Sequence, residues 1–337
     1  MNTMQPQHPD TILKVDNLRV SFDTLLGVRH ALRGVSFELQ RGKTLAIVGE
    51  SGSGKSVSSQ AILRIIRQPG RIVGGSITFH PRGEEPVEIT TLADKSERLF
   101  RLRGAQIGMI FQEPMTALSP VHTVGDQVAE AILLHRPVSR KDAWKIATDM
   151  LDRVGITQPD ERMRQFPFEL SGGMRQRVVI AMALVCRPEI LIADEPTTAL
   201  DVTIQAQILE LIEELKCEMG TSVIFITHDL GVVAQIADDV VVMNQGLVME
   251  SGPVRDIFKD PLHPYTQRLL AAMPRLDSEG AHGSASGGVT GGGFEAPDGY
   301  SVMPPGGHYQ GSVEPSLFRL ADGREVLIWP EVKEVAT

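Results

Sequence analysis

The sequence predicts an α/β fold built on a largely parallel sheet, and three observations carry this prediction. A short apolar run at residues 44–48 is followed at once by a glycine-rich loop and a helical pattern. Further apolar runs of strand length then alternate with amphipathic helical patterns. Shorter, partly alternating runs before residue 44 predict antiparallel strands beside the parallel core.

The N-terminal part is expected to begin with these antiparallel strands, at residues 12–15, 18–22 and 31–39. A turn at 40–43 then leads into the buried strand at 44–48. The helix after the glycine-rich loop is expected to continue through residues 58–66, because Ile62, Leu63 and Ile66 recur at helical spacing. Glycines 70, 74 and 75 are expected to end this stretch, and a strand to begin at 76–79.

The glycine-rich loop fits the phosphate-binding pattern G-x-x-x-x-G-K-[ST], the P-loop. It consists of Gly49, Glu50, Ser51, Gly52, Ser53, Gly54, Lys55 and Ser56. Its glycines let the backbone curl so that N–H groups face phosphate oxygens, and the following helix adds its positive end. Lys55 is expected to reach the β- and γ-phosphates, and Ser56 to bind Mg²⁺ through its hydroxyl. The alternative, an ordinary Gly/Ser turn, is much weaker in a strand–loop–helix context.

The rest of the chain continues the alternation of strands and helices. Buried strands are expected at 107–111, 189–193 and 222–227, helices at 124–134, 141–154, from 171 to before Pro188 and around 204–215, and a hairpin at 240–250. Residues 115–170 form a mostly helical insert in this pattern. In parallel sheets of this kind, ligands bind where the strands end.

Polar side chains follow the ends of three predicted strands. Asp194 and Glu195 end one strand, while Gln112 and His228 follow the others. The carboxylate pair suits phosphoryl transfer to water, with Asp194 holding Mg²⁺ and Glu195 polarising the attacking water as general base. Gln112 offers a donor and an acceptor to water or Mg²⁺, and a neutral His228 can bridge the γ-phosphate and the water. Taken singly, Gln112 and His228 are more simply ordinary loop residues.

A second anion-binding device is predicted at Ser171, Gly172 and Gly173, where a hydroxyl and bare backbone N–H groups open a helix. Both cradles could hold one nucleotide if the fold brought them together. Otherwise Ser171 must serve a nucleotide bound by another subunit. Sequence spacing leaves both arrangements open.

Composition excludes several classes of protein. The formal charge of -9 argues against a nucleic-acid binder by bulk electrostatics, apart from a local basic groove. The chain has two cysteines, Cys186 and Cys217, and neither lies in a CxxC or Cys/His pattern. We therefore expect neither a disulfide scaffold nor a zinc site. The first ten residues lack the pattern of a signal peptide, and no apolar run approaches the ~20 residues that span a bilayer.

Together the motifs resemble those of an ATP-binding subunit of an ABC transporter. They are the P-loop, Gln112, LSGGMRQR at 170–177, ILIADEP at 190–196, the Ala199-Leu200-Asp201 turn and His228. The resemblance covers about residues 12–276. It implies a P-loop NTPase domain of the ABC type, with an antiparallel β subdomain beside the core and a helical subdomain that touches the permease.

The resemblance also implies roles for these residues. Two such domains pack head to tail, so that Ser171, Gly172 and Gly173 complete the partner's ATP site. Glu195 would be the catalytic base, His228 the switch histidine and Asp201 part of the turn that couples the two sites. Gln112 would link Mg²⁺ to the loop that faces the membrane subunits, and Phe22 is the candidate for the aromatic ring that stacks on adenine.

Three further segments narrow the resemblance to ATP-binding subunits of the dipeptide/oligopeptide importer family. They are FQEPMTALSP at 111–120, TTALDVTIQAQIL at 197–209 and PLHPYT at 261–266. The resemblance implies an ATPase at the cytoplasmic face of the bacterial inner membrane, with ATP and Mg²⁺ as cofactors. Its partners would be a second ABC ATPase subunit (a paralogue or an identical copy), two transmembrane permease subunits and an extracytoplasmic solute-binding protein, with no nucleic acid.

Peptides are the expected solute, and oligosaccharides, opines or nickel are the alternative, because this family imports all of them. Members often carry a cysteine cluster after the HPYT segment that holds an iron–sulfur centre. No cysteine follows Cys217 here, so no cluster is predicted, which weakens the case for the dipeptide branch. Non-transport ABC ATPases of DNA or ribosomes are a minor alternative, since neither an inserted coiled coil or zinc module nor a second set of motifs is present.

The predicted organisation has five parts: an N-terminal tail at 1–11, the ATPase domain at 12–254 with its helical subdomain at about 115–170, an HPYT-type segment at 255–277, a Gly/Ser/Pro-rich linker at 278–311 and a β-hairpin tail at 312–337. The hairpin strands are expected at 316–320 and 325–329, around Asp322-Gly323. Because an isolated hairpin is marginal in water, it must dock on the main domain or on a partner. The hypothesis is that it pairs with the C-terminal region of the other ATPase subunit; a disordered tail with an incidental turn is the alternative.

Overall fold

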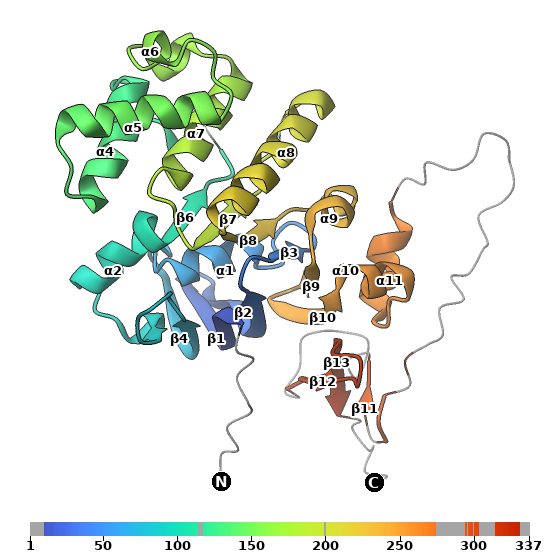
Figure 1. The fold of residues 1–337 in the computed structure, drawn as a ribbon. Coiled ribbons are helices and arrows are strands. Elements are labelled where there is room, and N and C mark those ends of the chain that lie inside the picture. Colours follow the sequence, from blue (N-terminus) through green and yellow to red (C-terminus); the bar gives the residue numbers. More distant parts are fainter. Residues whose placement is uncertain are drawn as a thin grey trace, which may run out of the picture.

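The computed structural model describes residues 10–113, 117–198, 200–273, 294, 296–298, 300–302 and 314–330. Within them, an antiparallel sheet and a mixed sheet lie against each other, and a group of helices projects from one end of the mixed sheet (Figure 1). Most of the predicted linker at 278–311 and of the N-terminal tail lies outside the described residues. No helix in the described part of the chain has the length and hydropathy to cross a membrane.

The antiparallel sheet has the strand order β2-β1-β4-β5. Its strands are β1 (Thr11–Thr24), β2 (Gly27–Gln40), β4 (Gly70–Phe79) and β5 (Val87–Glu88). Two expectations were wrong here: β1 is one strand with a bulge, and β4 begins at Gly70 and includes Gly74 and Gly75. The β1–β4 register shifts between Asp16 and Arg19, where Asn17 has φ 48° and Gly75 has φ 83°. A Cβ on Gly75 would lie 2.4 Å from the Asn17 carbonyl oxygen, so this glycine permits the bulge rather than ending the strand.

The mixed sheet has the order β11-β13-β10-β9-β3-β8-β7-β6, with β12 paired to β13. Its strands in chain order are β3 (Thr44–Val48), β6 (Ile107–Ile110), β7 (Ile190–Asp194), β8 (Ser222–Ile226), β9 (Asp239–Asn244), β10 (Leu247–Pro253), β11 (Tyr300–Ser301), β12 (Ser316–Arg319) and β13 (Glu325–Pro330). The pairs β6–β7, β7–β8, β8–β3 and β3–β9 are parallel. Their carboxyl ends therefore meet at one edge, where the predicted polar side chains emerge.

Helices cover the sheet and join its strands. They are α1 (Lys55–Ile62), α2 (Glu97–Arg101), α8 (Val202–Met219), α9 (Leu230–Ile236), α10 (Val254–Lys259) and α11 (Pro264–Ala271), with short helices at Ile89–Thr91, Leu102–Gln106 and Pro167–Glu169. Helix α1 begins in the P-loop as expected but ends at Ile62, not at residue 66. Arg64, two residues after the helix end, adopts a left-handed φ of 55°, which the helix cannot accommodate.

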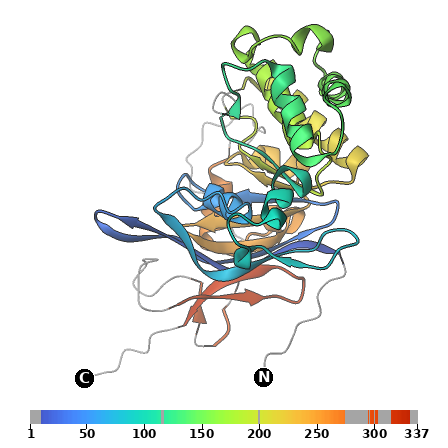
Figure 2. The same ribbon diagram turned by 90° about the vertical axis from the view of Figure 1, so that its left-hand side faces the viewer.

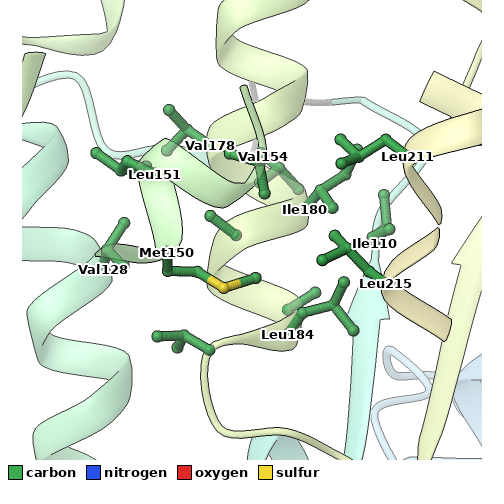
Figure 3. Packing of buried hydrophobic residues seen from close by; sticks show 14 of the residues in the cluster. Ile110, Val128, Met150, Leu151, Val154, Val178, Ile180, Leu184, Leu211 and Leu215 are labelled. Carbon is green, nitrogen blue, oxygen red and sulfur yellow. The ribbon is translucent and has the colours of Figure 1, made fainter. Parts of the chain in front are cut away.

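The helical insert contains α4 (Val124–His135), α5 (Arg140–Arg153) and α6 (Pro159–Arg162), and it packs on α7 (Gly172–Leu184). Hydroxyl side chains of Thr123, Ser139 and Ser171 cap α4, α5 and α7 by accepting backbone N–H bonds. Figure 3 shows Val178, Ile180 and Leu184 of α7 between the insert and the rest of the domain; around them lie Val128, Met150, Leu151 and Val154 of the insert, Leu211 and Leu215 of α8 and Ile110 of β6. Because the insert, α8 and β6 all pack on α7 in this core, α7 connects the insert to the sheet.

The C-terminal hairpin β12–β13 docks on the main domain of its own chain. Strand β13 pairs antiparallel with β10, and Figure 2 shows the hairpin in red beneath the blue antiparallel sheet. Leu327 and Trp329 are 3% and 2% exposed in a cluster with Met249, Ile257 and Tyr265. Of the two docking surfaces weighed from the sequence, the structure shows contact with the main domain, and pairing with a second subunit stays a prediction.

This docking predicts the effect of one substitution. Trp329→Ala should lower the free energy of unfolding by about 3–5 kcal/mol, since it empties a buried site. Phe318→Ala is the matched control, because Phe318 lies on the same hairpin but is 36% exposed, and its cost should stay below about 1 kcal/mol. Chemical unfolding of the full chain measures both. Equal costs, or an unchanged stability after deletion beyond Leu276, would contradict the docking.

Candidate nucleotide site

The carboxyl-terminal edge of the parallel strands opens into a cavity of about 920 Å³. The P-loop residues Ser51, Gly52, Gly54, Lys55 and Ser56 line it together with Phe22, Gln112 and Glu195. Residues of the β1–β2 arm, including Val28, Arg29 and His30, also line it. The fold thus brings eight sequence-predicted residues from four segments around one space large enough for a nucleotide.

The P-loop wraps around the ammonium group of Lys55. Lys55 Nζ donates to the carbonyl oxygens of Gly49 (2.8 Å) and Glu50 (3.0 Å), and the side chain is buried. Burial lowers the pKa of Lys55, while Glu195, Asp194 and Glu50 oppose this shift. Gly49 has φ 148°, and a Cβ there would lie 2.1 Å from the Met243 carbonyl oxygen, so only glycine fits. The lysine is thereby held at the mouth of the loop, beside the space for phosphate.

Ser56 and Asp194 meet at the start of α1. Ser56 Oγ donates to Asp194 Oδ1 (3.1 Å), and Ser59 Oγ faces Asp194 Oδ2 at 3.4 Å. Burial raises the pKa of Asp194, and the hydrogen bond from Ser56 opposes this rise. These hard oxygen donors next to a phosphate loop fit Mg²⁺, which binds through one or two protein oxygens and the substrate phosphates.

Glu195 lies at the centre of a polar cluster that we call the Glu195 cluster. Its Oε2 accepts from Gln112 Nε2 and from Thr198 Oγ1, both at 3.0 Å, and its Oε1 lies 3.5 Å from His228 Nδ1. The Glu195 backbone has a left-handed φ of 48°, a strained conformation typical of functional positions. The structure therefore brings the three predicted catalytic residues, Glu195, Gln112 and His228, into one cluster at the cavity wall.

Ser171, Gly172 and Gly173 do not line this cavity. Ser171 is exposed at the start of α7, where its Oγ accepts from Met174 N (3.3 Å), and the space around Gly172 is open. Asp201 caps α8 by accepting from Ile204 N (2.9 Å), and the Ile204 side chain lies 3.4 Å from where a Cβ of Gly173 would stand. The second anion cradle and Asp201 are thus neighbours on a separate, exposed face of this chain.

Phe22 lines the cavity, but one edge of its ring packs on the backbone of Gly70, where a Cβ would lie 2.5 Å from Phe22 Cε1. The ring is partly buried in the hydrophobic core below the antiparallel sheet. The stacking of Phe22 on adenine stays a prediction.

Sequence reasoning missed several residues of the site. Thr198 lies three residues after Glu195, and Ser59 lies one helical turn after Ser56, so both spacings were available as signals. Buried Gln176 donates to the Pro196 carbonyl oxygen (2.7 Å) and so ties α7 to the turn after Glu195. Tyr265, whose Oη accepts from Glu50 N (3.3 Å), gave no such signal, because its partner is far away in the sequence.

These features together define an ATPase of the ABC type. They are a P-loop, an acidic strand end, polar residues on the two neighbouring strand ends and a separate glycine-rich helix start. The ABC transporter family profile matches residues 32–198, and that of the oligopeptide/dipeptide transporter C-terminal region matches residues 249–290. The chain belongs to the family of ATP-binding subunits of dipeptide and oligopeptide ABC transporters.

Curated relatives support this assignment. The chain is 55% identical over 273 residues to the dipeptide transport ATP-binding protein DppD of Bacillus subtilis, covering 81% of this chain and 79% of the relative. It is 52% identical over 279 residues to the oligopeptide transport ATP-binding protein OppD of Salmonella typhimurium, covering 83% and 81%.

Solved structures resemble the fold. The chain matches the ATP-binding cassette MJ0796, a dimer in a post-hydrolysis state bound to ADP and Pi, with a TM-score of 0.63 and 27% identity over 72% of this chain and 99% of that one. It also matches cbiO1 of Clostridium perfringens, part of the cbiONQ ABC transporter complex, with a TM-score of 0.60 and 31% identity over 74% and 91%.

Proposed function

We propose that this chain hydrolyses ATP to drive a peptide importer from the cytoplasmic face of the bacterial inner membrane. The Glu195 cluster, at the wall of the P-loop cavity, is the single observation that carries the hydrolytic mechanism. The solute class rests on the relatives, which are peptide-transport ATP-binding proteins at 52–55% identity.

In this proposal the P-loop N–H groups bind the phosphates, and Lys55 exchanges its two carbonyl contacts for phosphate oxygens. Ser56, Asp194 and Gln112 would hold Mg²⁺, which neutralises charge on the phosphates. Glu195 Oε2 accepts a proton from water while the water oxygen attacks the γ-phosphorus and ADP leaves. His228 and Gln112, both next to Glu195, orient the carboxylate and the water.

The second cradle indicates a dimer. Ser171 and Gly172 are exposed and Gly173 is half-buried, and none of the three lines this chain's own cavity, so they are available to complete a site in a second ATPase subunit. The solved dimer of the similar cassette MJ0796 supports such an assembly. Asp201, next to Gly173 through Ile204, would couple the two sites. Two permease subunits and an extracytoplasmic binding protein complete the proposed machine.

Other solutes remain the second candidate, namely oligosaccharides, opines or nickel. Glutathione is a further case, since the chain is 54% identical to the glutathione import ATP-binding protein GsiA of Salmonella choleraesuis, of which it covers 43%. The ATPase does not touch the solute, so its own residues do not select among these. ABC ATPases that act on DNA or ribosomes are the non-transport alternative.

Reconstitution tests the proposal. The chain is co-expressed with the permease, ATPase and binding-protein products of neighbouring genes, purified and placed in liposomes. We expect peptide uptake that requires ATP on the side of the membrane where the ATPase subunits lie. We also expect the peptide-loaded binding protein to stimulate the ATPase rate. Stimulation by a sugar, opine or nickel instead would reassign the solute, and copurification with ribosomes or DNA in place of a permease would overturn the transport role.

A further inference from the structure

A buried carboxylate fixes the HPYT segment onto the main sheet. Glu250 of β10 is fully buried and accepts from the backbone N–H groups of Leu262 (2.9 Å) and His263 (3.0 Å). Burial raises the pKa of this carboxyl, and the Leu262 N–H group, the Thr266 hydroxyl, the His263 N–H group and Arg324 all oppose that rise. These two hydrogen bonds therefore fix the position of the start of α11 relative to strand β10.

His263 connects this fixed segment to Tyr265 through a backbone hydrogen bond. Its Nδ1 accepts from Tyr265 N (3.0 Å) and caps α11. Burial lowers the pKa of His263 to about 4, so the ring is neutral near pH 7 and Nδ1 is free to accept. Tyr265 is 5% exposed, and its phenol points at the P-loop, where Oη accepts from Glu50 N at 3.3 Å.

The contact with Glu50 acts on one particular peptide group. The N–H of Glu50 and the carbonyl of Gly49 belong to the same planar unit and point in opposite directions. Tyr265 binds the N–H, while the carbonyl accepts from Lys55 Nζ (2.8 Å). Gly49 has no side chain to restrain this peptide plane, so the phenol oxygen restrains it from outside.

We propose that Tyr265 is a positioning residue of the nucleotide site, which sets the orientation of the first P-loop peptide and thereby the affinity for β- and γ-phosphates. When Lys55 leaves the Gly49 carbonyl for a phosphate, the hydrogen bond to Tyr265 prevents the Gly49–Glu50 peptide plane from rotating. The N–H groups of the loop then keep their orientation toward the phosphates. The HPYT segment is then part of the ATP site and not only a C-terminal appendage. This inference rests on ATP hydrolysis at the P-loop and is independent of the solute.

The test is Tyr265→Phe in the assembled transporter. Tyr300→Phe is the control, because it also removes a phenol oxygen, while Tyr300 of strand β11 is 38% exposed and does not line the nucleotide cavity. We expect the KM for ATP and the Kd for ADP to rise about three- to tenfold, the size of one neutral hydrogen bond, with kcat within twofold. The Kd for AMP, which lacks the β- and γ-phosphates, and the melting temperature should match those of Tyr300→Phe.

Two results would overturn the inference. One is an unchanged KM for ATP in Tyr265→Phe while the wild type hydrolyses ATP normally. The other is weaker binding of AMP and ATP alike together with a lower melting temperature, which would assign Tyr265 to the fold alone. A wild-type complex without ATPase activity would instead contradict the proposed function itself, so the two failures are distinguishable.

Discussion

Glu195→Gln is expected to lower ATP turnover by about 10²–10⁴-fold and to leave ATP binding intact. The amide keeps the size of the side chain and one oxygen that can accept from Gln112 and Thr198, which both donate to Glu195 Oε2. It cannot take a proton from water, so the chemical step fails while the P-loop and Lys55 still bind phosphate. With hydrolysis blocked, two such subunits should remain closed around ATP.

Steady-state ATPase assays and retention of radiolabelled ATP on the assembled complex measure these effects. Glu210→Gln is the matched control, because Glu210 is an exposed glutamate on α8 outside the cavity. If the second ATPase subunit is a paralogue, its own intact site sets the residual rate, so the site supplied by this chain is read from single-turnover hydrolysis. Wild-type hydrolysis at that site would remove Glu195 from the role of catalytic base.

Three residues of the Glu195 cluster, Gln112, Glu195 and His228, could be predicted because each follows an apolar run of strand length. Buried parallel strands place their carboxyl ends at one edge, so Gln112, Glu195 and His228 converge once the strands are identified. The P-loop was predictable for the same reason, since its motif, strand and helix are contiguous. Local pattern and sheet topology together suffice for this half of the site.

The contacts that escaped prediction join segments far apart in the chain. The bulge at Asn17 depends on Gly75, and a local reading of Gly75 predicts the end of a segment instead. Similarly, no pattern near Tyr265 reveals that its phenol meets Glu50, and no pattern near Trp329 identifies Met249 and Ile257 as its neighbours. Such contacts depend on how whole elements pack, which periodicity does not encode.

Ser171→Asp is expected to lower the ATPase rate of the assembled complex by about 10²-fold or more, the cost of disturbing one preorganised contact to the reacting phosphate. Aspartate is a good N-cap, so it preserves the bond to Met174 N that starts α7, but it places a negative charge where the partner's γ-phosphate would lie. Ser171→Asn also preserves the cap and adds no charge, so its loss should be smaller. Equal losses would attribute the effect to the missing hydroxyl and not to charge repulsion.

Mixing two defective subunits shows whether the cradle acts within one chain or between two. Lys55→Ala disables the P-loop of its own chain, and Ser171→Asp disables the second cradle. In a head-to-tail dimer of one variant with the other, one composite site carries both defects and the second carries neither, so hydrolysis should return at up to half the wild-type rate. For a paralogous pair, the partner carries the substitution at its matching serine. If both cradles served one nucleotide within a chain, every mixed dimer would stay inactive, because each chain would keep its own defect.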